Sequence, residues 1–207
     1  MPAADRLRVV GVVPASGASR RMGRPKATID VQGRSFLERV SEALREGGCS
    51  RVVVVVAEQE GSVRAEAERL DVEVVLNPDP GDGPITSLRR ALDRLDPDVD
   101  AVAWLPLDHP LVEGAHVARL LEASRRSGAS LTIPVHAGKR GHPAIFRRSL
   151  FAELSDPELE GGARTVVHRH LGRACLVDFD EPGVVIDVDT PEALERLRAS
   201  LAGGGSG

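Results

Sequence analysis

Short β-branched runs alternate with stretches of helical spacing along the chain. The run at 51–58, RVVVVVAE, is almost continuously apolar, as in a parallel strand buried on both faces. Predicted strands occupy 9–13, 51–58, 72–76, 101–105 and 130–135, and predicted helices occupy 36–44, 60–70, 84–92, 113–127 and 193–201. Strands that alternate with helices are typical of βαβ units, so we expect a mostly parallel sheet wound by crossover helices.

The first predicted strand stops at Pro14 and leads into a loop of small and basic residues. Small residues at 15–19 let backbone N–H groups approach an anion closely. The loop then carries a cluster of four cations: Arg20, Arg21, Arg24 and Lys26. We expect it to bind a polyanion such as a phosphate chain. The alternative is a basic surface loop.

Two common phosphate-binding motifs do not match this loop. A Walker A loop has four residues between its glycines and then Lys followed by Ser or Thr. Here five residues separate Gly17 from Gly23, and Ala27 follows Lys26. No G-x-G-x-x-G dinucleotide fingerprint passes through Gly17 or Gly23 either. A nucleotide in this loop would therefore be bound in another way.

Two carboxylates have positions that suit ligand binding. One follows a predicted strand, and the other precedes a predicted helix. Asp108 follows the predicted strand 101–105 and lies between two prolines, and ligands bind at the carboxyl ends of such strands. A carboxylate held in this way suits a metal ion. Its alternative role is to cap the helix that begins near Glu113. Asp189 directly precedes Thr190, which with the next proline forms a good helix entry by itself.

The loop ASGASRRMGRPK (15–26) resembles the signature A-x-G-x-S-x-R-M-G-x-P-K of the molybdenum-cofactor nucleotidyltransferases, the MobA/MocA-type family, with Ser16 where relatives have Ala or Gly. Further matches begin at Asn77 (N-P-x-x-x-x-G-x-x-x-S), Asp108, Gly141 (G-H-P) and Asp187 (D-x-D-T-P-E). The resemblance covers 9–201 and implies a three-layer α/β/α nucleotidyltransferase fold, Rossmann-like and GT-A-like, with a mostly parallel sheet. It also implies one reversed strand near the substrate side. We expect a single NTP-transferase domain over 1–201 and a flexible Gly/Ser tail at 202–207.

The resemblance also implies roles for individual residues. Arg21, Lys26 and Asp108 would be catalytic, and Asp108 and Asp189 would hold Mg²⁺, with Asp187 in reserve. The implied nucleotide-binding residues are Ala15, Ser16, Gly17, Ser19, Arg20, Gly23, Asn77, Gly83 and Ser87. The resemblance places Gly141 and His142 at the acceptor, and the neighbouring cations Lys139 and Arg140 favour an anion site there. We also expect Arg164 at the acceptor, because it opens a predicted helix whose N–H groups can bind a phosphate.

Composition limits the partners. The formal charge of −4 argues against a nucleic acid or an anionic membrane. The longest apolar run, 52–57, is too short to span a bilayer, and the N-terminus lacks an apolar signal core. Two distant cysteines show no metal-ligand spacing. We expect a soluble cytoplasmic protein, and the sequence leaves its oligomeric state open.

The implied reaction is nucleotidyl transfer, in which a phosphate oxygen of an acceptor such as molybdopterin attacks the α-phosphorus of an NTP and pyrophosphate leaves. A sugar phosphate or another phosphorylated metabolite is an alternative acceptor. A non-catalytic nucleotide-binding module is a second alternative, which the presence of both Asp108 and Asp189 disfavours. A redox protein of the same fold is a third, which the missing dinucleotide fingerprint disfavours.

The base preference rests on Ser16. In the family that this loop resembles, guanylyl-transferring members have Ala-Gly-Gly at this point and cytidylyl-transferring members have Ala-Ala-Gly. This chain has Ala-Ser-Gly. A Cβ narrows the pocket, and a hydroxyl can bond a pyrimidine edge. We therefore expect CTP over GTP and a cytidylyltransferase-like activity.

Overall fold

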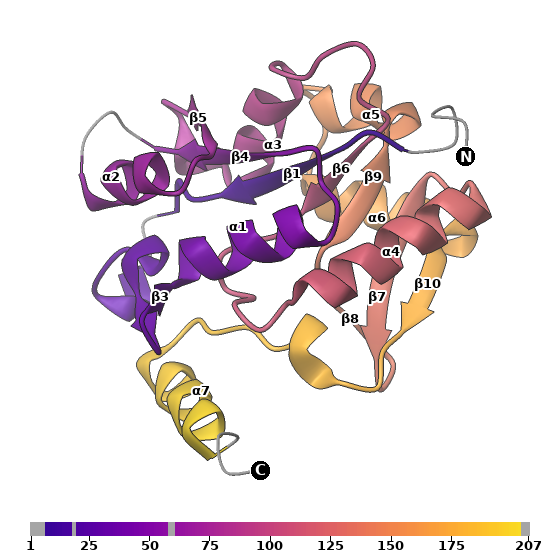
Figure 1. The fold of residues 1–207 in the computed structure, drawn as a ribbon. Helices are drawn as coiled ribbons and strands as arrows, with labels where there is room; N and C mark the ends of the chain where they lie inside the picture. The colour runs from indigo at the N-terminus through magenta and orange to yellow at the C-terminus, as the bar shows by residue number, and fades with distance from the viewer. Residues whose placement is uncertain (1–6, 18–19, 58–60, 204–207) are drawn as a thin grey trace.

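An eight-stranded mixed sheet forms the centre of the molecule in the computed structural model, which describes residues 7–17, 20–57 and 61–203 (Figure 1). The strand order is β10-β7-β9-β6-β1-β4-β5, and β8 pairs with β7 beside this path. The strands are β1 (Val9–Pro14), β4 (Arg51–Val56), β5 (Glu73–Leu76), β6 (Ala101–Trp104), β7 (Leu131–His136), β8 (Lys139–Arg140), β9 (Ala144–Arg147) and β10 (Cys175–Asp178).

The sheet is mostly parallel, as predicted. The strand β1 pairs in parallel with β4 and β6, and the β4–β5 and β7–β10 pairs are parallel too. The strand β9 runs antiparallel to both β6 and β7, and β8 runs antiparallel to β7. One reversed strand near the substrate side was expected; the structure has two, β8 and β9, and β9 directly follows the G-H-P segment.

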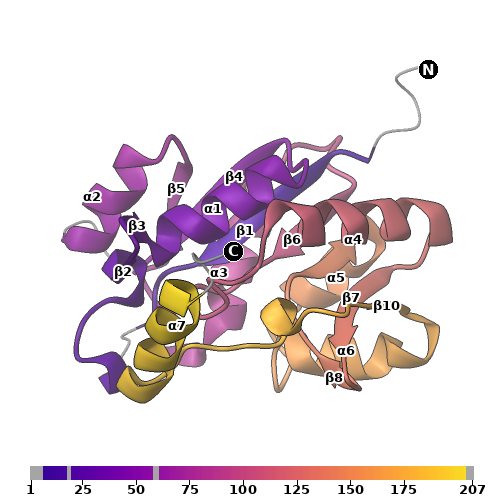
Figure 2. The same cartoon turned by 60° about the horizontal axis from the view of Figure 1, so that its bottom comes forward.

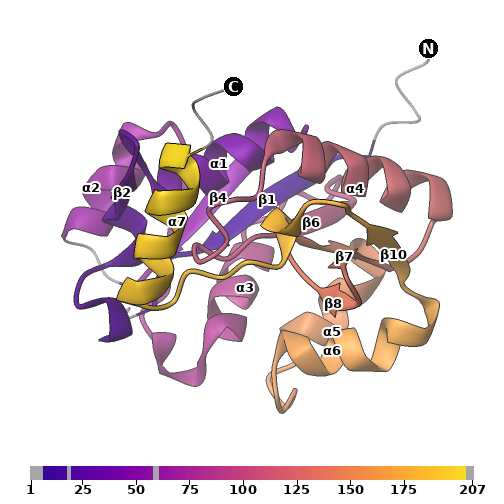
Figure 3. The same cartoon turned by 90° about the horizontal axis from the view of Figure 1, so that it is seen from below.

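Helices cover both faces of the sheet and complete three layers (Figures 1 and 3). Side chains of α1, α2 and α4 pack in one apolar core, and those of α3, α5 and α6 pack in another. The helices are α1 (Phe36–Glu46), α2 (Ser62–Arg69), α3 (Pro84–Leu92), α4 (Gly114–Ser127), α5 (Phe151–Ser155), α6 (Ala163–His170) and α7 (Pro191–Gly203). The three-layer fold class is therefore confirmed.

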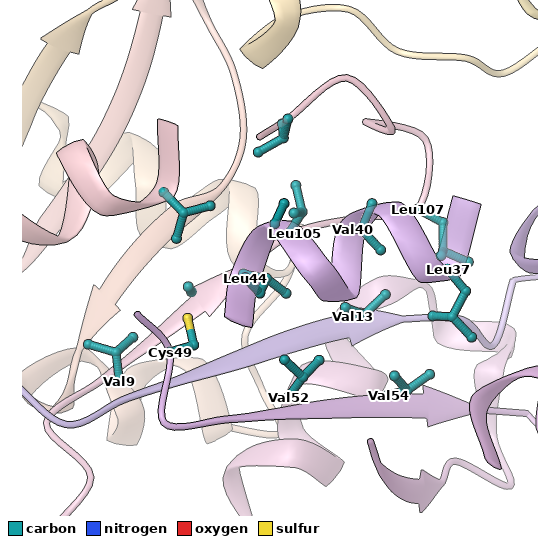
Figure 4. Close-up of a cluster of buried hydrophobic side chains, with 14 of the residues drawn as sticks. Val9, Val13, Leu37, Val40, Leu44, Cys49, Val52, Val54, Leu105 and Leu107 are labelled. Carbon is teal, nitrogen blue, oxygen red and sulfur yellow. The ribbon is translucent and has the colours of Figure 1, made fainter. Parts of the chain in front are cut away.

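The helix α1 shows why this sequence forms this packing. Leu37, Val40 and Leu44 recur at helical spacing and lie against the valines of β1 and β4, such as Val13 (Figure 4). All four side chains are fully buried. The helix begins where the Ser35 hydroxyl accepts a hydrogen bond from the Glu38 N–H at 3.0 Å.

A third, smaller core joins the segment after β1 to the last helix. The strands β2 (Asp30–Val31) and β3 (Arg34–Ser35) form a hairpin, and α7 lies beside it (Figure 2). Ile29, Phe36, Val188 and Leu197 are buried between these elements. This core fixes the glycine loop against the segment that carries Asp189.

Some features differ from the sequence prediction. Neither β10 nor the β2–β3 hairpin was predicted, and each strand of the hairpin has only two residues, which are too few to show a period. The helix α7 continues to Gly203, two residues beyond its predicted end at 201, and 204–207 lie outside the described residues. Within the described part of the chain, the helices are too short or too polar to cross a membrane. The single-domain expectation stays a prediction.

Candidate active site

Two cavities meet at the carboxyl-terminal edge of the sheet. The narrow cavity, of about 490 Å³, is lined by the glycine loop, by the segment before α3 and by Asp189. The wide cavity, of about 830 Å³, extends toward β9 and α6. Four residues line both cavities: Pro14, Pro84, Pro106 and Asp108. Asp108 is therefore the charged residue that both cavities share.

The glycine loop is anchored at its start and turns twice before α1. The Ala15 N–H donates to the Val55 carbonyl at 2.8 Å, so this amide extends the sheet and is not directed at a ligand. Two short 3₁₀ turns, Arg20–Met22 and Lys26–Thr28, follow on either side of Gly23. Gly23 has a φ of 66°, a conformation that favours glycine. The turns place the side chains of Arg21 and Lys26 on the narrow cavity.

Lys26 connects the two predicted metal-binding carboxylates. Its ammonium forms an ion pair with Asp189 and lies 3.7 Å from Asp108 Oδ2. Arg21 Nη2 lies 3.2 Å from Asp189 Oδ2. The backbone brings the two carboxylates together, because the Val188 N–H donates to the Asp108 carbonyl at 2.7 Å. The segment that makes this bond runs from β10 to α7 past the sheet edge (Figure 3).

The pKa values of the two carboxyl groups shift in opposite directions. The hydrogen bond from Lys26 holds the pKa of Asp189 below its usual value, and Arg21 adds to this effect. Burial raises the pKa of Asp108, and the nearby charge of Asp189 raises it further, while Lys26 opposes both. Asp108 is therefore the carboxylate that gains most from an additional cation.

These residues fit a divalent cation. Asp108 Oδ1 is buried and has no hydrogen-bond partner among the described residues. The described residues contain no group of three or more acidic, His or Cys side chains that could hold a metal. Mg²⁺ is commonly bound by only one or two carboxylates together with substrate phosphates. Asp108 and Asp189 match that sparse pattern. Asp108 does not cap α4, because Glu113 occupies the cap position.

A buried hydroxyl and amide network lies beneath the narrow cavity. Ser16 Oγ and Ser87 Oγ are 2.7 Å apart, and Asn77 Nδ2 donates to Ser87 Oγ at 3.2 Å and to Thr86 Oγ1 at 2.8 Å. Asn77 and Ser87 are fully buried and do not line the cavity, whereas Ser16 and Gly83 do. We predicted Asn77 and Ser87 at the nucleotide; their side chains lie behind Ser16, and the nucleotide contact itself stays a prediction. They thereby join the two walls of the cavity.

Two histidines lie behind Asp108 toward the wide cavity. The rings of His109 and His142 have centroids 4.6 Å apart, and His109 Nε2 is 3.8 Å from Asp108 Oδ1. Burial lowers the pKa of each imidazole to about 4, so both are neutral near pH 7. Of this pair, only His142 lines the wide cavity.

The residues predicted for the acceptor separate into two groups. Gly141, His142 and Arg164 line the wide cavity, together with Arg140. Lys139 lines neither cavity. Lys139 and Arg140 are consecutive in β8, and successive strand residues point to opposite faces, so only one of them can face the cavity.

Two predicted residues cannot be placed, and one cavity residue was not predicted. Ser19 lies outside the described residues, and the Arg20 side chain is also not described. His168 lines the wide cavity but was not predicted. It is four residues from Arg164 on α6, and this spacing puts the two on one helix face, a signal that was present in the sequence.

Several known proteins resemble this chain over almost its whole length. The model of the MobA-like NTP transferase domain matches residues 11–174. A nicotine blue oxidoreductase of Paenarthrobacter nicotinovorans is 32% identical and covers 91% of this chain and 96% of its own length. A probable molybdenum cofactor guanylyltransferase of Opitutus terrae is 36% identical and covers 96% and 99%.

The comparison with solved structures gives the same family of folds. The Rv0371C protein of Mycobacterium tuberculosis, solved in complex with manganese, is 26% identical and has a TM-score of 0.73. The match covers 93% of this chain and 99% of that one. The domain match includes the glycine loop, the Asn77 segment, Asp108 and the G-H-P segment. This chain therefore belongs to the family of MobA-like NTP transferase domains, the MobA/MocA-type nucleotidyltransferases.

Proposed function

We propose that the protein transfers a nucleotidyl group from an NTP to the phosphate of a small acceptor and releases pyrophosphate. The observation that carries the proposal is the pair of cavities that share Asp108. One cavity holds the cations expected for a triphosphate, and the other is large enough for a second substrate. A transfer enzyme needs two such sites that open on one charged point.

The narrow cavity is the proposed NTP site. Lys26 and Arg21 would bind phosphate oxygens, because both are cations that line this cavity beside the glycine loop. Both also pair with Asp189. A triphosphate would compete for these cations, and a divalent ion would compensate Asp189 in their place.

A divalent cation, for which we propose Mg²⁺, would be held by Asp108 and Asp189 and would neutralise phosphate charge when bound. Support comes from the buried, unpartnered Asp108 Oδ1 and from the manganese complex of the Mycobacterium tuberculosis relative. No third protein ligand is needed, since NTP phosphates can complete the coordination.

The wide cavity is the proposed acceptor site. An acceptor phosphate that enters past His142 would reach Asp108 and, beyond it, the narrow cavity. Its oxygen would form a bond to the α-phosphorus while the bond between the α-phosphorus and the bridging oxygen breaks, and pyrophosphate carries away the electron pair. An acceptor phosphate is already ionised, so the chain's task is to align two anions and offset their charge.

The sequence and the relatives favour different bases in the donor nucleotide. The probable guanylyltransferase at 36% identity supports GTP, and we take GTP as the first candidate donor. The Cβ of Ser16 on the narrow cavity supports CTP as the second. The Ser16 hydroxyl is engaged by Ser87, which weakens the expectation that it bonds a pyrimidine edge. We propose molybdopterin as the first acceptor to test, with sugar phosphates and other phosphorylated metabolites next.

An oxidoreductase activity is a second candidate because the Paenarthrobacter nicotinovorans relative carries that name. The two activities give different signals. Nucleotidyl transfer releases pyrophosphate from an NTP only when an acceptor and a divalent cation are present. A redox activity changes the absorbance of a nicotinamide cofactor without any pyrophosphate. Measuring both with GTP, CTP, ATP and UTP decides between them, and absence of pyrophosphate with every NTP and acceptor would overturn the proposal.

A further inference from the structure

The wide cavity carries far more positive than negative charge. Three arginines line it, Arg89, Arg140 and Arg164, and Asp108 is the only acidic residue among its lining residues. With a cation on Asp108, the lining would have no uncompensated negative charge. A neutral acceptor tail would leave these arginine charges without a partner on the ligand.

Two of the three arginines have no partner in the described part of the chain. Arg89 donates to the carbonyls of Leu154 at 3.2 Å and Asp156 at 2.5 Å, so its guanidinium helps to end α5. No hydrogen bond or ion pair to the described residues engages the side chain of Arg140 or Arg164. By contrast, Arg8, Arg51 and Arg69 all pair with carboxylates.

The two arginines lie on the part of the wide cavity that is not shared with the NTP site. The residues common to both cavities come from the ends of β1 and β6 and the start of α3, whereas Arg140 comes from β8 and Arg164 from the first turn of α6. Both residues are among the lining residues of the wide cavity. Two cations from different elements thus line the same region.

Apolar side chains lie on the rest of the cavity wall. Trp104, Ile133 and Phe146 are buried residues of β6, β7 and β9 that line it. These strands form the floor, and the arginines come from elements beside it. A ligand that contacts both therefore has an apolar middle and a charged end.

We propose that the acceptor carries a second anionic group, distinct from the phosphate that attacks the NTP, and that Arg140 and Arg164 bind it. The inference rests on the proposed function, because it assumes that the wide cavity takes the acceptor. The second group is a carboxylate or a phosphate, since a guanidinium pairs with either in the same forked geometry. His168, one turn after Arg164, lines the same region.

The test compares ligands that differ only in the second anion. The probes are pentylphosphonate, a pentane bisphosphonate with a phosphonate at each end, and a phosphonoalkanoate of the same length. Binding is measured by isothermal titration calorimetry with the full chain, and NTP binding with Mg²⁺ is measured on the same samples. One variant carries both Arg140→Gln and Arg164→Gln. The control is Arg126→Gln, which replaces an exposed arginine of α4, a helix on the opposite face of the sheet.

We expect each probe with two anionic groups to bind the wild type and the control about 10-fold tighter than pentylphosphonate, as charge-assisted hydrogen bonds imply. The double variant should lose this advantage and keep its affinity for NTP. A tighter bisphosphonate assigns a phosphate to the second group, and a tighter phosphonoalkanoate assigns a carboxylate. An advantage that is absent in the wild type, or that survives in the double variant, overturns the inference. Failure of the wild type to bind NTP is a separate result, and it overturns the proposed function.

Discussion

At the scale of single residues, Lys26 is the centre of the site. The chain has only two lysines among its many basic residues, and this one lies between Asp108 and Asp189. An ammonium on a flexible stem can exchange carboxylate partners for phosphate oxygens, which a rigid guanidinium fork does less easily. The contact with both carboxylates was not predictable from sequence, because 163 residues separate Lys26 from Asp189 along the chain.

Replacement of Asp108 by Asn should remove cation-dependent activity. The amide keeps the shape of the side chain but lacks the charge that holds Mg²⁺, so turnover should fall at least about 100-fold. The measurement is pyrophosphate release at several Mg²⁺ concentrations, with thermal unfolding as the check on folding. Wild-type turnover in a folded Asp108→Asn protein would exclude this residue as a ligand.

Two substitutions at Ser16 separate its Cβ from its hydroxyl. Ser16→Ala keeps the Cβ and loses the bond to Ser87, whereas Ser16→Gly loses both. If the Cβ sets the base preference, only the Gly variant should shift the ratio of CTP to GTP affinities toward GTP, by about 1–3 kcal/mol. Equal ratios in wild type and Ser16→Gly would mean that position 16 does not select the base.

Cys49 gives a prediction for pH. Burial raises the pKa of its thiol to about 12, from 9.0 for an exposed thiol, so the folded protein keeps this proton to higher pH than the unfolded chain. The resulting stability is present in full below pH 9 and is lost as pH rises from there toward 12. At pH 8 an alkylating reagent should modify the half-buried Cys175 first and reach Cys49 only after unfolding. Peptide mass spectrometry checks the order, and a Cys49→Ala variant should lose this part of the pH dependence.

At the scale of elements, the turn around Gly141 positions His142. The Gly141 N–H donates to the Pro134 carbonyl and the His142 N–H to the Val184 carbonyl, each at 2.8 Å. These bonds connect the start of β9 both to β7 and to the Pro182–Val184 turn. The packing leaves no room for a side chain at 141, because a Cβ there would lie 2.0 Å from the Val184 carbonyl oxygen.

Gly141→Ala should therefore destabilise the fold and displace His142. The clash involves backbone atoms, which move less easily than a side-chain end, so we expect a loss of about 1–3 kcal/mol of unfolding free energy. Urea denaturation measures it. Gly172→Ala is the control, since a Cβ at 172 would meet nothing within 4 Å. A Gly141→Ala protein as stable as this control would contradict the packing argument.

The elements also show what sequence reasoning can reach. The helices α1, α3 and α4 were predicted close to their observed bounds, because caps and turn residues mark both their ends. The hairpin β2–β3 was missed because its turn uses Gln32 at a φ of 56°, where Asn or Gly is the usual signal. Asn77 illustrates the limit for sites: its motif was visible, but only the fold shows that the side chain is fully buried.

At the scale of the whole molecule, the negative net charge hides a local concentration of cations. The formal charge is −4, yet Arg21, Lys26, Arg140 and Arg164 all line the two cavities at one sheet edge. The excess lies in the wide cavity, where three arginines face one acidic residue among the described lining residues, and such a cleft attracts small anions even when the surface as a whole does not. An acidic protein thereby presents a group of cations at one edge of its sheet.

Titration of wild type and Lys26→Ala with GTP and CTP, each with and without Mg²⁺, tests most directly whether the narrow cavity binds the nucleotide. We expect the wild type to bind at least one of the two NTPs and Mg²⁺ to tighten this binding. Lys26→Ala should weaken the binding by about 10-fold or more, as loss of a charge-assisted contact to phosphate implies. Equal affinity in wild type and a folded Lys26→Ala, or no Mg²⁺-dependent NTP binding by the wild type, would contradict the assignment of the narrow cavity as the nucleotide site.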